Sequence, residues 1–249
     1  DFACKADSFD DKSRWLLGDN AGTRFRELHQ HTIPAPQDVP EVRRSFPEGG
    51  YFVMGDRIGR SDEIKLNVAA GPLGYLSIAA HGHADALSFT LNVAGREMLI
   101  DPGTYAYQTS DGWREYFKGT SAHNTVRIDG QDQSVSGGSF IWLRHARVQC
   151  ELFEVKQDRD RFAGSHDGYR RLSDPVTHRR EIDLDKAAQT IAIVDTLECR
   201  GTHEVEVHWH FAELCDVALE VDSFLIRQRN VQLRLALAGI DFEPECVIG

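Results

Sequence analysis

From Tyr51 onward, short runs in which hydrophobic and polar residues alternate recur along the chain, separated by Gly, Asp and Pro. Because successive side chains of a strand point to opposite sides, each run predicts a β-strand with one buried face. Many short strands with turn residues between them favour antiparallel sheets packed face to face. The sequence therefore predicts an all-β fold, a large antiparallel β-sandwich, with strands at residues 51–54, 64–68, 87–91, 97–100, 125–128, 146–155, 176–184, 190–194, 205–211, 224–226 and 231–235.

The runs at residues 87–91 and 97–100 are predicted to form a hairpin. A three-residue loop at 93–95 would place Gly95 where a left-handed residue is needed. Asp101 would then share a face with His83, whereas a two-residue loop would turn every side chain of the strand over. The predicted pairs are Leu87 with Asp101, Phe89 with Leu99, and Asn92 with Arg96.

Two histidines, His81 and His83, precede this hairpin. In an extended backbone both rings would lie on one face of the strand. With Asp101 they suggest a zinc site, and His123 is the candidate for a third nitrogen ligand; three protein ligands leave a fourth position for water. The alternative is that these histidines are only hydrogen-bonded at the end of a sheet. The convergence of three histidines and a carboxylate favours the metal.

Four sequence blocks resemble the heparinase II/III-like proteins, a family of polysaccharide lyases. They are His-Gly-His-Ala-Asp at 81–85, Ile-Asp-Pro-Gly-Thr-Tyr at 100–105, Trp-Arg-Glu-Tyr-Phe at 113–117 and Ala-His-Asn-Thr-Val at 122–126. The order and spacing of all four blocks match, which is more specific than any single motif. The resemblance implies that His83, Asp101 and His123 bind zinc, and that His81 lies in the catalytic cleft.

The family pattern also predicts how the chain is organised. In the family a helical toroid precedes a supersandwich-like β-sandwich, and no toroid is recognisable in this sequence. Residues 1–45 have little periodicity apart from a short helix predicted at 13–17, and residues 18–25 resemble the family segment that joins toroid to sandwich. We therefore interpret residues 1–45 as a linker from a missing helical domain and residues 46–249 as the β-sandwich domain, with the toroid of the full-length chain as its partner.

The chemistry implied by the resemblance is β-elimination at a uronic acid. The C5 proton is removed and the bond to O4 breaks, which requires a neutralised carboxylate together with a base and an acid. His81 has a ring suited to neutralisation or proton transfer. Tyr105 and Tyr116 are candidate proton carriers, and Arg114 is a candidate bidentate ligand for a substrate carboxylate. Family members take further catalytic groups from the toroid.

Composition restricts the class of ligand. The net charge of −11 over 249 residues argues against nucleic-acid binding, which depends on Lys and Arg that neutralise phosphates. A local basic cluster can still bind an anionic substrate, such as a glycosaminoglycan or alginate, in a chain that is acidic overall. The candidate basic groups are Arg114, Lys118, Arg127, Arg144, His145 and Arg147.

The cysteines and the lengths of the hydrophobic runs bear on the cellular compartment in which the protein is expected. Five scattered cysteines without a Cys-x-x-Cys motif argue against a disulfide framework, and no run is long enough to span a membrane. A polysaccharide lyase is expected in the periplasm or outside the cell. So many free thiols are unusual there, so a cytoplasmic location stays open.

Two other functions compete with the lyase hypothesis. A cupin-type metal oxygenase also starts from His-x-His on a strand, but it expects a glutamate within residues 85–89, where there is none. A non-catalytic carbohydrate-binding or structural β domain could hold the same metal only for stability. A second pair, His208 and His210, alternates with apolar residues and is interpreted as structural.

Overall fold

The computed structural model describes residues 14, 17–18, 20–30, 44–107, 111–239 and 246–247. Contacts within the chain divide it into two units, Asp1–Arg43 and Arg44–Gly249. In the first unit the structure describes the helix α2 (Ala21–Gln30), which the sequence analysis did not predict. The helix predicted at 13–17 lies mostly outside the described residues.

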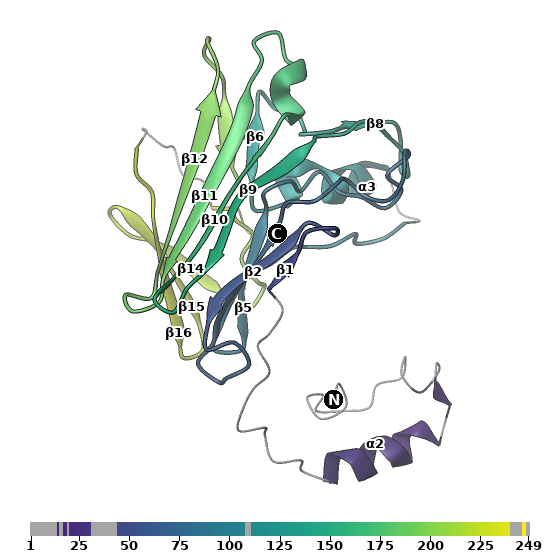
Figure 1. The fold of residues 1–249 in the computed structure, drawn as a ribbon, viewed down its shortest axis with the longest axis vertical. Helices are drawn as coiled ribbons and strands as arrows, with labels where there is room; N and C mark the ends of the chain where they lie inside the picture. Colours follow the sequence, from purple (N-terminus) through teal and green to yellow (C-terminus); the bar gives the residue numbers. More distant parts are fainter. Residues whose placement is uncertain are drawn as a thin grey trace. The chain divides into compact units, whose positions relative to one another are not determined.

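The second unit is built from antiparallel sheets, as predicted (Figure 1). A five-stranded sheet has the order β1 (Ser45–Phe46), β2 (Tyr51–Asp56), β3 (Ile64–Ala69), β4 (Phe89–Val93), β5 (Arg96–Leu99). A four-stranded sheet has the order β12 (Thr190–Glu198), β11 (Thr177–Asp185), β10 (Arg159–His166), β9 (Val148–Val155). The smaller sheets pair β13 (Val205–Val207) with β6 (Val126–Ile128), β7 (Val135–Ser136) with β8 (Trp142–Arg144), and β14 (Asp216–Leu219) with β15 (Ser223–Gln228) and β16 (Val231–Ala236).

Alternating burial along the strands explains why the sheets pack as a sandwich. In β3 every second residue is buried, and the same alternation runs through β11. Ile64, Leu66 and Val68 of β3 and Ile182 and Leu184 of β11 belong to one hydrophobic core. The ring of Phe52 in β2 lies 5.6 Å from that of Phe162 in β10. The five-stranded and four-stranded sheets therefore bury their apolar faces against each other, which confirms the predicted β-sandwich.

Among the described residues of this unit, three short helices lie between strands: α3 (Asp111–Lys118), η1 (Thr120–Ala122) and η2 (Gly168–Arg171). The sequence analysis predicted none of them. The helix α3 carries Trp113, Tyr116 and Phe117 at positions i, i+3 and i+4, which lie on one face of a helix. That periodicity was present in the sequence, but it is short.

The hairpin of β4 and β5 differs from its prediction. Its turn has two residues, Ala94 and Gly95, both with positive φ (50° and 69°), and Val93 pairs with Arg96. Such a turn matches the twist of the strands better than the predicted three-residue loop. A bulge at Met98 then shifts the register so that Leu91, not Phe89, faces Leu99.

A buried arginine of the four-stranded sheet is paired with a partly buried carboxylate. Arg180 of β11 is fully buried, and its Nε and Nη2 donate to the two carboxylate oxygens of Asp195 in β12, at 2.8 and 2.9 Å. Its Nη1 donates to the carbonyl oxygens of Leu87 and Asn124, at 2.8 and 2.7 Å. One side chain therefore joins the sheet to two loops that are distant in sequence.

Two buried histidines extend this network. His166 Nδ1 accepts the Gly168 N–H, so His166 donates through Nε2 to His178 Nδ1 at 3.0 Å. His178 consequently donates through Nε2 to Asp195 at 2.7 Å. Both rings of this chain of hydrogen bonds are buried, so His178 is not open to solvent.

Replacing Arg180 should destabilise the fold strongly. Arg180→Met would leave the Asp195 carboxylate without its bidentate partner and should lower the free energy of unfolding by about 3–5 kcal/mol. Arg179, the next residue, is partly exposed and paired with Glu151 and Glu181, so Arg179→Met should cost at most about 1 kcal/mol. Urea denaturation measures both, and equal losses would contradict the proposed importance of the buried pair.

The two buried histidines should make stability depend on pH. The pKa values of His166 and His178 are lowered, mainly because burial disfavours the charged ring. Below about pH 6.5 the unfolded chain takes up protons that the folded chain does not bind, so stability is full above that pH and falls below it. His166→Gln should reduce the loss of unfolding free energy between about pH 7.5 and about pH 5.5. An unchanged pH dependence in this variant would refute the assignment.

Candidate active site

Three segments that are far apart in sequence bring His83, Asp101 and His123 together. His83 lies in the connection between β3 and β4, Asp101 follows β5, and His123 follows η1. Each residue offers one ligand atom, and these atoms all lie within 4.8 Å of one another. The three predicted ligands therefore share one site.

Hydrogen bonds order this site. His123 Nδ1 lies 2.6 Å from Asp101 Oδ2, while Asp101 Oδ1 accepts the N–H of Gly103 at 2.9 Å. His83 Nε2 lies 3.2 Å from the hydroxyl of Thr104. His123 is fully buried, and its Nε2 has no hydrogen-bond partner among the described residues. A buried ring nitrogen without a partner is costly unless a further ligand satisfies it.

The electrostatics favour a neutral imidazole beside an ionised carboxylate. Burial, with His123 nearby, lowers the pKa of His83 to about 4. Burial, the largest single influence, would raise the pKa of Asp101, but the hydrogen bond and charge of His123, the N–H of Gly103 and the nearby His83 together lower it. Neutral imidazole and carboxylate are the forms that bind a divalent cation.

Asn124 holds two of the three segments in place. Its Nδ2 donates to the carbonyl oxygens of Phe89 and Ile100, both at 2.8 Å, and its Oδ1 accepts the N–H of His210 at 2.6 Å. Ile100 and Asn124 are the immediate neighbours of Asp101 and His123. The Asn of the His-Asn-Thr block therefore fixes the distance between these two side chains.

The loop that carries His83 is held by residues that follow Asn124 in the chain. The Thr125 hydroxyl and Gln133 Nε2 both donate to the carbonyl oxygen of Ala86, each at 3.0 Å. Arg180 binds the next carbonyl, that of Leu87. These donors were not identified from the sequence, because nothing in their spacing relates them to the histidines.

His81 does not lie as predicted. Its φ is +65°, so the backbone from His81 to His83 is not an extended strand and the two rings do not share a face through strand alternation. His83 turns toward His123, with ring centroids 5.3 Å apart. The exposed His81 instead lies with Nδ1 3.2 Å from the hydroxyl of Tyr107. The structure therefore separates the two histidines into different environments.

Tyr107 is a site residue that sequence analysis missed. Its ring stacks on Phe140, and both rings meet His81 nearly edge-on. The guanidinium of Arg114 lies 5.1 Å from the Tyr107 ring centroid. The only signal in the sequence was its position two residues after Tyr105.

The predicted proton carriers lie in an exposed aromatic cluster formed by Tyr105, Trp113, Tyr116 and Phe117. Tyr105 is 65% exposed and stacks on Phe117 with ring centroids 5.0 Å apart. Tyr116 is 42% exposed and meets Phe117 edge-on. Both phenols are open to solvent, so a substrate can reach them.

Arg114 is buried, which differs from the open carboxylate-binding group that the sequence suggested. Its Nε donates to the carbonyl oxygen of Ser139 at 3.2 Å, and its Nη1 has no partner among the described residues. Lys118 is also buried and donates to Ser136 Oγ at 2.7 Å. Arg127 pairs with Glu206 at 3.1 Å. The side chains of Lys118 and Arg127 are thus paired with other residues of the fold.

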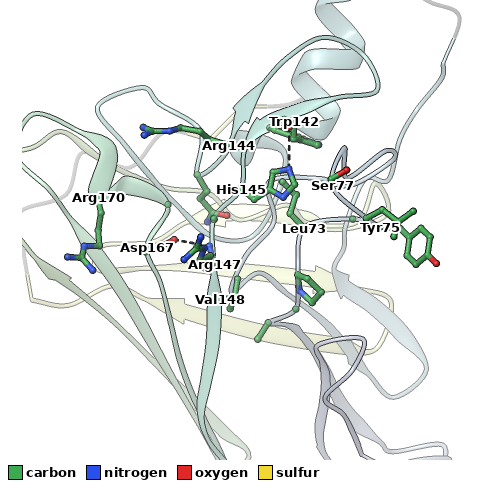
Figure 2. Close-up of a pocket in the computed structure, with 18 of the residues that line it drawn as sticks. Leu73, Tyr75, Ser77, Trp142, Arg144, His145, Arg147, Val148, Asp167 and Arg170 are labelled. Atoms are coloured by element: carbon green, nitrogen blue, oxygen red, sulfur yellow. Dashed lines mark hydrogen bonds between the residues drawn. The ribbon is translucent and has the colours of Figure 1, made fainter.

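A pocket of about 1140 Å³ adjoins the His81–His83 loop (Figure 2). The two features are linked by Trp142, which lines the pocket and donates through Nε1 to the carbonyl oxygen of Gly82 at 2.9 Å. The pocket is lined by residues 70–77, 142–148, 167–168 and 170–171, with Pro47, Phe52, Gln133 and Cys150.

The pocket has a basic end. Its lining holds Arg144, Arg147, Arg170 and Arg171 but only one carboxylate, that of Asp167. The guanidinium of Arg171 donates its hydrogen bonds to backbone carbonyl groups, including that of Gln133 at 3.4 Å. In the described part of the chain the other three guanidinium groups make no hydrogen bond or ion pair, and Figure 2 shows them at the end opposite Tyr75. Unpaired arginines concentrated in an acidic chain favour an anionic ligand.

The second histidine pair is structural in its contacts. His210 Nε2 lies 2.9 Å from the carbonyl oxygen of Ser121, and the His208 and His210 rings are stacked. Neither residue belongs to a group of three potential metal ligands within the described residues. None of the described cysteines forms a disulfide, and no described helix is long and apolar enough to cross a membrane.

Comparison with known proteins agrees with this architecture. Residues 38–244 match the family model described as heparinase II/III-like, C-terminal. A heparin-sulfate lyase from Bacteroides thetaiotaomicron is 26% identical over 115 residues, which cover 44% of this chain and 16% of that protein.

Solved structures share the fold. A heparinase III gene product aligns with a TM-score of 0.62 and 21% identity over 85% of this chain and 30% of its own. The heparan sulfate lyase HepC from Pedobacter heparinus aligns with a TM-score of 0.58 and 16% identity over 90% of this chain and 37% of its own. The chain thus spans well under half the length of these relatives. It belongs to the heparinase II/III-like family and corresponds to that family's C-terminal β-sandwich domain.

Proposed function

We propose that this chain is the zinc-binding β-sandwich part of a polysaccharide lyase that cleaves a uronic-acid-containing polysaccharide by β-elimination. The observation that carries the proposal is the convergence of His83, Asp101 and His123 from three separate segments. Relatives named as heparin-sulfate and heparan sulfate lyases support the reaction class.

The residues of the site fit zinc. Two imidazoles and a carboxylate are a common ligand set for this ion, and the unpartnered, buried His123 Nε2 is an atom that a ligand would satisfy. When bound, zinc would hold the three segments together and offer a Lewis-acidic fourth position. The carbonyl contacts of Asn124 keep the segments in place independently of the ion.

His81 is suited to act on the substrate rather than on the metal. It is exposed, and its Nδ1 shares a hydrogen bond with Tyr107, so the ring can exchange a proton with the phenol or stabilise a substrate carboxylate. Neutralising that carboxylate makes the C5 proton acidic. Tyr105 and Tyr116 are the accessible phenols that can take or deliver a proton at C5 or O4, and further groups would come from the helical domain of the longer protein.

The basic end of the pocket supports an anionic polymer as substrate. Arg144, Arg147 and Arg170 can each bind a carboxylate or sulfate group. Arg114 does not line this pocket, and its unpartnered Nη1 is buried. A polymer with a charge on every sugar can engage this end of the pocket while another unit lies at His81.

Of the two alternative functions, the cupin-type oxygenase is excluded and the non-catalytic β domain remains to be separated by experiment. The cupin-type oxygenase is ruled out by the family match and by the bent backbone at His81, since a cupin motif requires His-x-His on a strand. A non-catalytic β domain would use the same metal ligands without turnover, so activity separates it from the lyase.

Metal binding should distinguish His83 from His81. Zinc at about 100 times its dissociation constant should raise the free energy of unfolding of the wild-type chain by about 2.7 kcal/mol. His83→Ala should abolish this gain and lose the metal on dialysis, whereas His81→Ala should keep both. Elemental analysis and urea denaturation give the two readouts. Full zinc retention in His83→Ala would contradict the assignment of His83 as a zinc ligand.

Catalysis should require His81 in the longer protein that carries the helical domain. There His81→Ala should keep its zinc but lose about 10²–10⁴-fold in the rate at which unsaturated product forms, followed by absorbance. The 249-residue chain alone should show little turnover. Arg179→Met, which removes a side chain paired with Glu151 and Glu181, is the control and should retain wild-type activity. Normal turnover in His81→Ala would remove the histidine from the mechanism.

A further inference from the structure

A second group of potential metal ligands lies apart from the His83 site and shares no residue with it. It consists of Asp174, Cys199 and His203, whose ligand atoms all lie within 4.8 Å of one another. Asp174 lies between η2 and β11, Cys199 directly follows β12, and His203 precedes β13. Two separate stretches of chain, the connection that holds Asp174 and the loop 199–203, thus meet at this group.

His203 is oriented by a carboxylate on its far side. Its Nδ1 lies 2.7 Å from Asp129 Oδ2, and its Nε2 lies 3.0 Å from Asp174 Oδ2. The His203 side chain is only 7% exposed. A carboxylate that accepts the Nδ1–H fixes the tautomer and leaves Nε2 as the ligating atom, an arrangement that recurs around protein-bound zinc.

Asp174 is held in place by the loop that carries the other two ligands. Its Oδ2 accepts the N–H groups of Arg200 and Gly201, at 3.0 and 2.6 Å. A side chain at Gly201 would have its Cβ 3.0 Å from the same oxygen, so glycine permits this approach. The loop 199–203 therefore wraps around the carboxylate and presents a thiol and an imidazole to it.

Cys199 has an available thiol. Its side chain is exposed, and its Sγ lies 3.8 Å from the carbonyl oxygen of Gly201, which is a weak contact. An imidazolium between two carboxylates would explain the two His203 contacts but would give the thiol no role. A metal ion uses all three side chains.

The distances suit a tetrahedral ion. Bonds of about 2.0–2.1 Å to nitrogen and oxygen place two ligand atoms about 3.3 Å apart. The Nε2 to Oδ2 distance of 3.0 Å is within a few tenths of an ångström of that value. Thiolate, imidazole and carboxylate donors together suit zinc or cobalt better than magnesium or calcium.

We propose that Asp174, Cys199 and His203 form a second divalent-metal site of the zinc class, with Asp129 as the positioning residue for His203. Cys199 binds as a thiolate and releases its proton to solvent. The site joins the turn after β6 to the connections that precede β11 and β13. It therefore fixes one end of β6, while His123 lies just before the other end.

Cobalt(II) is the probe that separates the two sites, because only the second contains a thiolate. Titrating the metal-depleted chain with cobalt should produce a thiolate-to-cobalt charge-transfer band in the near ultraviolet. The band should vanish in Cys199→Ala and persist in Cys150→Ala, Cys215→Ala and His83→Ala. Asp129→Asn retains a residue that tolerates the positive φ of this position and should weaken binding about 10–100-fold.

Two results would overturn the proposal. One is the absence of the band when cobalt is in excess, with cobalt held only by the site that His83→Ala abolishes. The other is a band that survives in Cys199→Ala. Competition by zinc, read as loss of the cobalt band, should give the higher affinity for zinc expected from the donor set.

Discussion

The side chain of Arg180 connects the sandwich to the candidate active site. Its guanidinium is fully buried, so it must be paired, and Asp195 pairs with it through both carboxylate oxygens. The remaining donor binds the carbonyl groups of Leu87 and Asn124, which belong to the loops that carry the site. A buried guanidinium without partners would destabilise the core. Because the partners of Arg180 include these two carbonyl groups, the arginine also holds the loops against the sandwich.

The site is assembled by backbone carbonyl groups rather than by regular secondary structure. His83, Asp101 and His123 all lie outside strands, and Asn124, Thr125 and Gln133 bind the carbonyl groups beside them. Hydrogen bonds of this kind hold the ligand-bearing loops in position, while the outer surfaces of the loops stay open to a substrate. One loop therefore carries both the exposed His81 and the His83 ring that faces the buried His123.

Much of the fold followed from the sequence because alternation of polar and apolar residues has a direct physical cause. The strands β3, β9 and β11 were found in this way, and the four sequence blocks identified the family and the group His83, Asp101 and His123. The hairpin register was wrong because a two-residue turn with Ala94 at positive φ and a bulge at Met98 leave no clear pattern in the sequence. The bend at His81, the contact with Tyr107 and the burial of Arg114 depend on residues distant in sequence, which periodicity does not relate.

The central claim is that His83, Asp101 and His123 bind zinc. Crystals of the chain grown with zinc, measured on both sides of the zinc absorption edge, test it most directly. The account predicts an anomalous peak bonded to these three side chains at about 2.0–2.2 Å, with the His81 ring turned away from it toward Tyr107. A site without a peak at full zinc saturation, or a peak bonded to His81 in place of His83, would contradict the account.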